Sequence, residues 1–224
     1  MRSRPVVTID GPSGSGKSTV SKRLAEVAGM VRLDTGAMYR AVALAARRCG
    51  VPWDDPVLLG GLARDLDVSF RIVDGAQRIY LSGDDVSEAI RTPEISMGAS
   101  AVSVHGSVRE ALVARQREMA REGGVVLEGR DTGTVVFPDA EAKFFLDAAA
   151  AVRALRRYRE ISPPGAQSFE EVLRDVLRRD VQDSTREHSP LRVADDATYI
   201  DSTTMTVDEV VREMMRRMPE RPRR

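Results

Sequence analysis

The sequence is poor in the residues that build disulfide or zinc frameworks. It contains one cysteine, Cys49, so we expect no disulfide framework and no cysteine metal site. Its two histidines, His105 and His188, have no partner at metal-ligand spacing, and we assign them no catalytic role. No apolar run is long enough for a membrane span or a secretory signal. We therefore expect a cytoplasmic protein without a membrane partner.

An excess of charge of one sign is also absent. The chain has 34 basic and 34 acidic residues, and aromatic residues make up only 4% of it. Nucleic-acid-binding proteins usually combine a basic surface with aromatic side chains that stack on bases, so we expect no nucleic acid partner. Lysine occurs only at Lys17, Lys22 and Lys143, and the other basic residues are arginines. A lysine inside a motif is therefore informative.

Short apolar segments alternate with amphipathic ones, which predicts an α/β fold with a parallel sheet. Residues 6–9 are typical of a buried strand. The helix expected over residues 18–28, with Gly29 just past its end, would bury Val20, Leu24 and Val27. We expect Cys49 and Trp53 to pack in the interior. Further strands are predicted within residues 30–36, 125–129, 143–147 and 198–202, and further helices over residues 37–50, from Thr92 as N-cap, over 107–122 and over 207–218.

Residues 68–83 alternate between apolar and polar side chains on either side of Asp74-Gly75, which predicts a β-hairpin. A hairpin is unexpected in a chain built of strand-helix-strand units, and it indicates an inserted lobe. The predicted organisation is a core of residues 1–61 and 94–220, an insert of residues 62–93 and a tail of residues 221–224.

The segment "GPSGSGKS" matches the P-loop pattern G-x-x-x-x-G-K-[S/T] at every fixed position. Its glycines allow positive φ angles, so that backbone N–H groups can surround a phosphate at a helix N-terminus. Lys17 would reach the β- and γ-phosphates, and the Ser18 hydroxyl would bind Mg²⁺. A strand before the loop and a helix after it argue against an ordinary glycine turn. The predicted nucleotide-binding residues are Gly11, Pro12, Ser13, Gly14, Ser15, Gly16, Lys17, Ser18 and Thr19.

Switches, motors and kinases all use P-loops, so other segments must separate these classes. The Asn-Lys-x-Asp guanine-reading motif of common GTPases is absent. A motor ATPase would normally end an apolar strand in Asp-Glu, whereas the nearest segment, "VVLEGRD", has Arg130 at the place of a second acid. An arginine there would destabilise a metal site but suits a second phosphate. The sequence therefore favours a small-molecule kinase.

Seven segments resemble the cytidylate kinases, a branch of the nucleoside monophosphate kinases, in order and spacing: "IDGPSGSGKST", "LDTGAMYR", "VSEAIRTPEI", "VREAL", "EGRDTGTVVFPDA", "RDVQDSTR" and "IDST". Adenylate kinases differ at "GRDTGTVVFPDA". The resemblance implies a P-loop kinase with a central parallel sheet flanked by helices, an acceptor-binding insert containing the hairpin, and a short lid at about residues 153–170. It also implies ATP and Mg²⁺ as cofactors and CMP or dCMP as acceptor, and we expect a monomer.

The resemblance implies that three arginines hold the acceptor phosphate. These are Arg40, Arg130 and Arg186, which together with Lys17 would offset the charge of the transferred phosphoryl group. On the donor side, arginines of the lid would close over the ATP phosphates, and the candidates are Arg153 and Arg157.

The resemblance also implies a cytosine reader made of Asp131, Arg109 and Ser100. A carboxylate accepts a hydrogen bond from the cytosine amino group, which uracil lacks, so Asp131 is the natural source of discrimination. The other implied contacts are the ribose readers Arg179 and Asp183, the pocket residue Tyr39, and Thr35, which stands where the family often has serine.

Plainer interpretations stay open. Arg40, Arg109 and Arg179 fall on predicted helices, where an arginine usually faces solvent. A kinase for UMP or for a non-nucleotide is an alternative, and so is a nucleotide-dependent regulatory module that hydrolyses ATP slowly. Turnover with CMP, dCMP, UMP and AMP separates these possibilities, because a regulator would hydrolyse ATP at a rate that CMP does not change.

Overall fold

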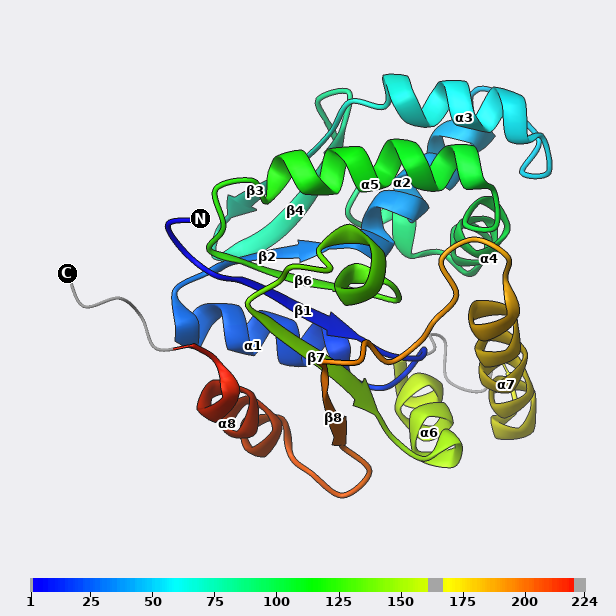
Figure 1. Ribbon diagram of the computed structural model, residues 1–224. Helices are drawn as coiled ribbons and strands as arrows, with labels where there is room; N and C mark the ends of the chain where they lie inside the picture. Colours follow the sequence, from blue (N-terminus) through cyan, green and yellow to red (C-terminus); the bar gives the residue numbers. More distant parts are fainter. Residues whose placement is uncertain (1, 161–166, 220–224) are drawn as a thin grey trace. The chain divides into compact units, whose positions relative to one another are not determined.

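The computed structural model describes residues 2–160 and 167–219. Contacts within the chain divide it into unit 1, residues 1–32 and 120–224, and unit 2, residues 33–119. Figure 1 follows the chain through both units. Residues 161–166 of the expected lid and the expected tail, residues 221–224, lie outside the described residues.

Unit 1 is built on a five-stranded sheet with the order β2-β6-β1-β7-β8. The central strand β1 (Val6–Asp10) pairs in parallel with β6 (Val125–Gly129) and β7 (Ala142–Asp147), and β8 (Thr198–Asp201) pairs in parallel with β7. Strand β2 (Val31–Asp34) forms the edge. All residues of β1 and β6 are buried, as expected for strands covered on both faces. The predicted parallel sheet is confirmed.

Helices α1 (Lys17–Ala28) and α8 (Val207–Arg217) pack on one face of this sheet, where they are seen side by side in Figure 1. Leu24 and Met214 are fully buried in this core together with Ile9. Val27, however, is 47% exposed, so its predicted burial is wrong. The buried face of α1 also takes in Ser21, Ala25 and Ala28, and Val27 lies beyond its edge. Two further helices pack on each other, α6 (Ala150–Glu160) and α7 (Phe169–Thr185).

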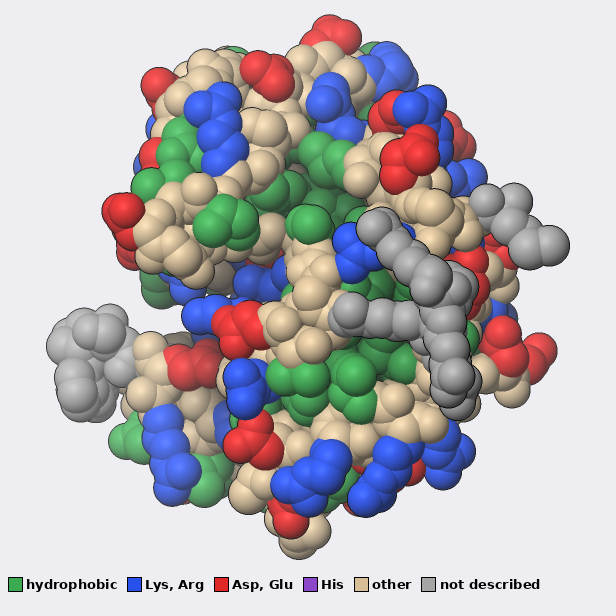
Figure 2. Space-filling model, turned by 90° about the vertical axis from the view of Figure 1, so that its left-hand side faces the viewer, with side chains coloured by type: hydrophobic (Ala, Val, Ile, Leu, Met, Phe, Trp, Pro, Cys, Tyr) green, Lys and Arg blue, Asp and Glu red, His purple; other side chains and the backbone are tan. Residues whose placement is uncertain are grey.

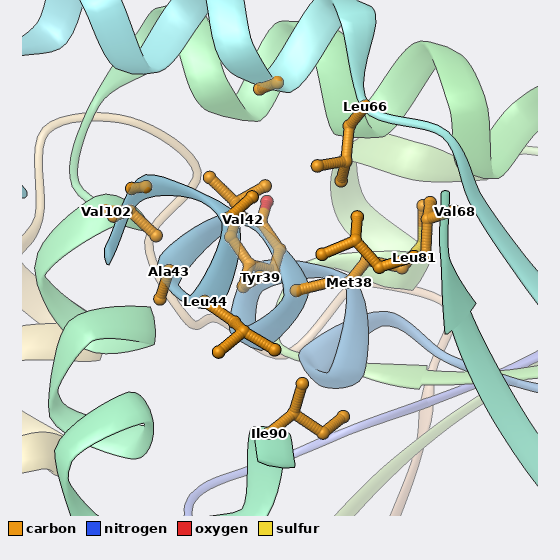
Figure 3. Close-up of a cluster of buried hydrophobic side chains, with 14 of the residues drawn as sticks. Met38, Tyr39, Val42, Ala43, Leu44, Leu66, Val68, Leu81, Ile90 and Val102 are labelled. Atoms are coloured by element: carbon orange, nitrogen blue, oxygen red, sulfur yellow. The ribbon is translucent and has the colours of Figure 1, made fainter. Parts of the chain in front are cut away.

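Unit 2 is organised around helix α2 (Thr35–Arg48), whose residues between Ala37 and Ala46 are buried with the exception of Arg40. Figure 3 shows Met38, Val42 and Leu44 of this helix surrounded by apolar side chains from other elements. A helix that is apolar nearly all round must be covered on every side. The covering elements are α3 (Pro56–Asp65), β3 (Val68–Val73), β4 (Ala76–Leu81), β5 (Asp84–Asp85), η1 (Ala89–Arg91), α4 (Pro93–Val102) and α5 (Gly106–Met119).

The predicted hairpin is confirmed, because β3 and β4 pair antiparallel across a two-residue turn. Both turn residues, Asp74 and Gly75, have positive φ angles, which matches the twist of the strands. Thr92 caps α4 as predicted, accepting a hydrogen bond from the Ile95 amide at 3.2 Å. Helix α5 ends at Met119 rather than at residue 122, because the chain turns before Gly123, whose φ is positive.

Cys49 and Trp53 differ in their environments. Cys49 is exposed, so its predicted packing is wrong. Trp53 does pack: its indole nitrogen donates to the Ala43 carbonyl oxygen at 3.1 Å. His105 has a structural contact here, with its Nε2 2.9 Å from the Trp53 carbonyl oxygen.

The surface carries charges of both signs. Figure 2 shows basic and acidic side chains interspersed over one face, as expected from the equal numbers of each in the sequence. In the part of the chain that the structure describes, no helix is both long enough and apolar enough to cross a membrane.

The contact between Trp53 and Gly98 leads to a prediction about stability. A Cβ atom added at Gly98 would lie 2.5 Å from Trp53 Cζ2, so we expect Gly98→Ala to lower the free energy of unfolding by about 1–3 kcal/mol. Urea unfolding measures this. Gly61→Ala is the matched control, because a Cβ there meets no atom within 4 Å, and the change should raise the helix stability by about 0.5–1 kcal/mol. Equal effects of the two substitutions would contradict this packing argument.

Candidate phosphate-transfer site

The loop between β1 and α1 has the backbone that a phosphate cradle requires. Gly14 and Gly16 have φ angles of 77° and 94°, and Gly16 is the N-cap of α1. A Cβ at Gly14 would also lie 2.7 Å from the carbonyl oxygen of Arg153. The predicted need for glycine in this loop is therefore confirmed by its conformation and its close packing.

Lys17 is a buried cation at the start of α1. Its Nζ donates to the Pro12 carbonyl oxygen at 2.6 Å and to Ser15 Oγ at 3.3 Å. Burial, and secondly the positive charge of Arg130, lower the pKa of Lys17 to about 7. An ammonium group in such a place is stabilised by an arriving anion, because the anion supplies the charge that the surroundings lack.

Glu128, at the end of strand β6, is a functional candidate that the sequence interpretation passed over. Its buried carboxylate accepts from Ser18 Oγ at 2.8 Å and from Arg32 Nε at 2.7 Å. The signal for it in the sequence is an acid at the end of the apolar segment "VVLE". Residue types alone do not show that this acid meets the P-loop serine.

The oxygen donors of Ser18 and Glu128 fit the chemistry of Mg²⁺. This ion prefers oxygen ligands, and it usually keeps several waters while using one or two carboxylates. Within residues 2–160 and 167–219, no group of three or more histidine, cysteine, aspartate and glutamate side chains is placed to hold a metal ion. A hydroxyl and one carboxylate therefore suit an ion that also binds nucleotide phosphates.

Asp183 brings two of the predicted phosphate-binding arginines together in unit 1. Its Oδ2 accepts from Arg130 Nε at 2.7 Å, and its Oδ1 lies 3.6 Å from Arg186 Nη1. Burial alone would raise the pKa of Asp183, but the charge and hydrogen bond of Arg130 and the charge of Arg186 hold it below its usual value. Asp183 and Arg186 stand at the end of α7, and Arg130 follows β6.

A second group of arginines lies close enough to Arg130 to repel it. Burial, followed by the charges of Arg157 and Arg130, lowers the pKa of Arg179. Arg179 is half-buried, so it is not the solvated helix residue of the plainer interpretation. Arg157 makes an ion pair with Glu160 at 3.3 Å and remains the better candidate for a lid contact.

Arg153, an expected lid residue, is held by contacts inside unit 1. Its side chain is 7% exposed and is engaged by the Asp180 carboxylate, at 3.1 and 2.7 Å. It also donates to the carbonyl oxygens of Ala148 and Ser13. These contacts place Arg153 behind the P-loop and satisfy its guanidinium donors inside unit 1.

Asp131 is buried and stands at the start of a π-helix, η2 (Thr132–Val136). Asp10, the last residue of β1, fixes this turn: its carboxylate accepts from the Thr132 amide and hydroxyl at 2.9 and 2.8 Å and from the Gly133 amide at 2.7 Å. Burial raises the pKa of Asp10, although these hydrogen bonds oppose the shift. One residue thus holds both the entry to the P-loop and the turn that carries Asp131. Isolated π-helical turns often occur at functional sites.

The remaining predicted residues belong to unit 2, where two arginines are held in place. Arg40 pairs with Asp34 at 3.1 Å, and Asp34 caps α2 through the Ala37 amide. The buried Arg109 lies over the ring of Tyr39, 5.3 Å from its centroid, and donates to the Ser103 carbonyl oxygen. Neither arginine is a fully solvated helix residue. Thr35 is buried and Ser100 half-buried in the same unit.

Comparisons with known proteins agree on one family. Residues 7–220 match the family model described as cytidylate kinase. The cytidylate kinase of Geobacter sulfurreducens is 52% identical over 219 residues, covering 97% of this chain and 94% of that protein. That of Syntrophotalea carbinolica is 50% identical over 222 residues, covering 99% and 94%.

Solved structures with a lower similarity include other kinases. A gluconokinase from Sinorhizobium meliloti is 18% identical, with a TM-score of 0.49 and coverage of 97% of this chain and 93% of that chain. A shikimate kinase from Acinetobacter baumannii is 16% identical, with a TM-score of 0.46 and coverage of 95% and 92%. This likeness is too distant to bear on the site.

The pair formed by Asp183 and Arg130 predicts a pH-dependent contribution to stability. We expect Asp183→Asn to lower the free energy of unfolding at pH 7 by about 1–3 kcal/mol, because it leaves the half-buried Arg130 without its charged partner. Since the folded-state pKa of Asp183 lies below its unfolded value of 3.8, this contribution is present above about pH 4 and is lost as the pH falls further. Urea unfolding between pH 6 and pH 3 follows the loss.

Asp175→Asn is the control on the same helix, because Asp175 makes a partly exposed pair with Arg178 at 3.0 Å. Such a pair contributes less than about 1 kcal/mol. An Asp183→Asn effect that stayed constant down to pH 3 would contradict the assigned pKa direction.

Proposed function

The chain belongs to the cytidylate kinase family, and we propose that it transfers the γ-phosphoryl group of ATP to CMP or dCMP, giving ADP and CDP or dCDP. The observation that carries this proposal is the electrostatic proximity of Lys17 and Arg130 within unit 1. The positive charge of Arg130, an arginine of the proposed acceptor site, lowers the pKa of the P-loop Lys17. Two phosphates that meet between them would remove this repulsion.

On the donor side, the P-loop amides and Lys17 would bind the β- and γ-phosphates of ATP. Mg²⁺ would bind the Ser18 hydroxyl and, through water, the Glu128 carboxylate, and would reduce the charge of the phosphates. Arg32 supports this arrangement, because its hydrogen bond keeps the Glu128 carboxylate oriented. The lid arginine of this proposal is Arg157.

On the acceptor side, Arg40, Arg130 and Arg186 would hold the phosphate of CMP. Among the described residues, Arg40 Nε is buried and has no hydrogen-bond partner, so it is a donor that a phosphate oxygen would satisfy. Arg179 and Asp183 would bind the ribose, while Asp131, Arg109 and Ser100 would read cytosine beside Thr35 and Tyr39. The insert of residues 62–93 is our candidate for a moving acceptor lobe.

The chemistry requires alignment and charge compensation rather than a base. An oxygen of the CMP phosphate, already ionised at neutral pH, forms a bond to the γ-phosphorus while the bond from that phosphorus to the bridging oxygen breaks and ADP leaves. Lys17, Arg130 and Arg186 would stabilise the charge that spreads over the transferred group. Exclusion of water from the closed site would prevent hydrolysis of ATP.

A coupled assay of ADP release tests the acceptor. We expect turnover with CMP and dCMP to exceed turnover with UMP, because the amino group of cytosine donates to Asp131, whereas uracil carries a carbonyl oxygen at that position. A purine acceptor such as AMP should be a poor substrate. Turnover with AMP as fast as with CMP would contradict the cytosine site, and ATP hydrolysis unaffected by CMP would favour a regulatory module instead.

Asp131→Ala tests the base reader itself. We expect kcat/KM for CMP to fall by about 100-fold or more, because the cytosine amino group loses the carboxylate that accepts its hydrogen bond. The affinity for ATP should change little. Asp195→Ala, which removes an exposed carboxylate of the same unit, is the control and should leave both quantities unchanged. Loss of ATP binding in Asp131→Ala with unchanged acceptor preference would refute the assigned role.

We also propose that the enzyme is a cytoplasmic monomer without a nucleic acid partner. The single cysteine and the balanced charge of the sequence support this part of the proposal. Light scattering of the purified chain checks the oligomeric state.

A further inference from the structure

The carbonyl oxygens of a phosphate-binding loop create a problem of their own. When successive N–H groups turn toward an anion, the C=O groups of the same peptides turn away from it, and each needs a donor when buried. In this chain the Pro12 oxygen accepts from Lys17, and the Ser13 oxygen accepts from Arg153 at 3.1 Å. Ser15 comes directly before Gly16 and Lys17, so its carbonyl group belongs to the same peptide as the Gly16 N–H of the phosphate site.

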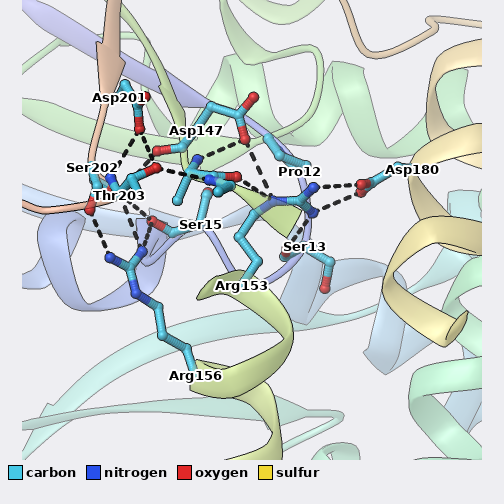
Figure 4. A network of polar contacts seen from close by, with 12 residues as sticks. Pro12, Ser13, Ser15, Asp147, Arg153, Arg156, Asp180, Asp201, Ser202 and Thr203 are labelled. Atoms are coloured by element: carbon cyan, nitrogen blue, oxygen red, sulfur yellow. Dashed lines mark hydrogen bonds and ion pairs between the residues drawn. The ribbon is translucent and has the colours of Figure 1, made fainter. Parts of the chain in front are cut away.

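Two side chains from distant segments converge on the Ser15 carbonyl oxygen, as Figure 4 shows. Arg156 of helix α6 donates to it from Nη1 at 3.1 Å, and Ser202 Oγ lies 3.3 Å from it. The same guanidinium also donates to Ser202, reaching its Oγ at 3.1 Å and its carbonyl oxygen at 2.8 Å. Arg156 therefore joins the segment "IDST", which has no role in the reaction as derived so far, to the P-loop.

The "IDST" segment is itself rigidly held. Asp201 Oδ1 accepts from the Thr203 amide at 2.9 Å, which closes a local turn around Ser202. The Thr203 hydroxyl accepts from the Ala149 amide at 2.8 Å, just before α6 begins. Ser202 is buried, and its backbone amide donates to the Asp147 carbonyl oxygen at 2.8 Å. The turn thus fixes the start of α6 and the support of the loop at one point.

We propose that Arg156 and Ser202 are positioning residues for the ATP phosphates, acting through the Ser15 carbonyl group and not by touching the nucleotide. A guanidinium hydrogen-bonded to this carbonyl polarises the peptide between Ser15 and Gly16, so that the Gly16 N–H becomes a stronger donor toward a phosphate. The Ser15 side chain extends the effect to Lys17, whose Nζ donates to its hydroxyl at 3.3 Å.

Ser202 has a single hydroxyl proton, which it shares between the oxygens of Asp147, at 2.9 Å, and Ser15, at 3.3 Å. Its larger contribution is as an acceptor that orients the guanidinium of Arg156. The effect of Ser202 on the loop should therefore depend on Arg156. This dependence distinguishes a shared support from two independent contacts.

Titration of a non-hydrolysable ATP analogue into the full chain with Mg²⁺ tests the proposal. We expect Arg156→Met to weaken analogue binding about 10-fold, from the loss of charged hydrogen bonds, and Ser202→Ala to weaken it about 3-fold. The double variant should bind about as weakly as Arg156→Met alone. Arg156→Lys keeps the charge and should recover part of the affinity. In steady state, KM for ATP should rise in each variant while KM for CMP stays constant.

Arg212→Met is the control, because Arg212 is an exposed arginine of helix α8 in the same unit, and it should bind the analogue like the wild type. Analogue affinity of Arg156→Met within about 2-fold of wild type, or effects of the two single variants that simply multiply, would overturn the proposal. It rests on the proposed nucleotide site but not on the acceptor. A wild-type chain that fails to bind the analogue would refute the proposed function, whereas wild-type binding with insensitive variants would refute only the support by Arg156.

Discussion

The concentration of positive charge in unit 1 is the constraint on which the rest of the site depends. The charge of Arg130 reaches both Lys17 and Arg179, and together with burial it lowers the pKa of each. Folding must therefore hold like charges in place against their repulsion, using contacts elsewhere in the unit. Anions would offset this repulsion, and the two phosphates of the proposed reaction would supply the negative charge.

Buried carboxylates keep this arrangement ordered without neutralising all of it. Asp183 lies between Arg130 and Arg186, and Glu128 connects Arg32 to the P-loop serine. Asp10 differs from both, since its close partners are neutral N–H and O–H groups. These donors let it join the end of β1 to the turn after β6, so that the P-loop and Asp131 are fixed by the same residue.

Arginine has two distinct uses in this chain, and residue type alone does not separate them. Arg153 and Arg156 satisfy carbonyl oxygens behind the P-loop, whereas Arg130, Arg179 and Arg186 gather where charge is left over. The planar guanidinium suits both uses because it donates in several directions while remaining charged. Oxygen acceptors offset the cost of burying Arg130, Arg153 and Arg156, and the identity of the acceptor indicates the use.

The sequence by itself determined the sheet strands, the hairpin at Asp74-Gly75, the cap at Thr92 and the glycine loop, because each depends on local backbone preferences or on a short periodic pattern. It also identified the arginines near Asp183, through their motif. Only the tertiary structure decided that Val27 and Cys49 are exposed, that Glu128 meets Ser18, and that Arg153 faces Asp180. Those outcomes depend on which surfaces of distant segments meet. The contacts of a side chain with residues more than 20 positions away are set by the packing of the whole unit and not by its neighbours in the sequence.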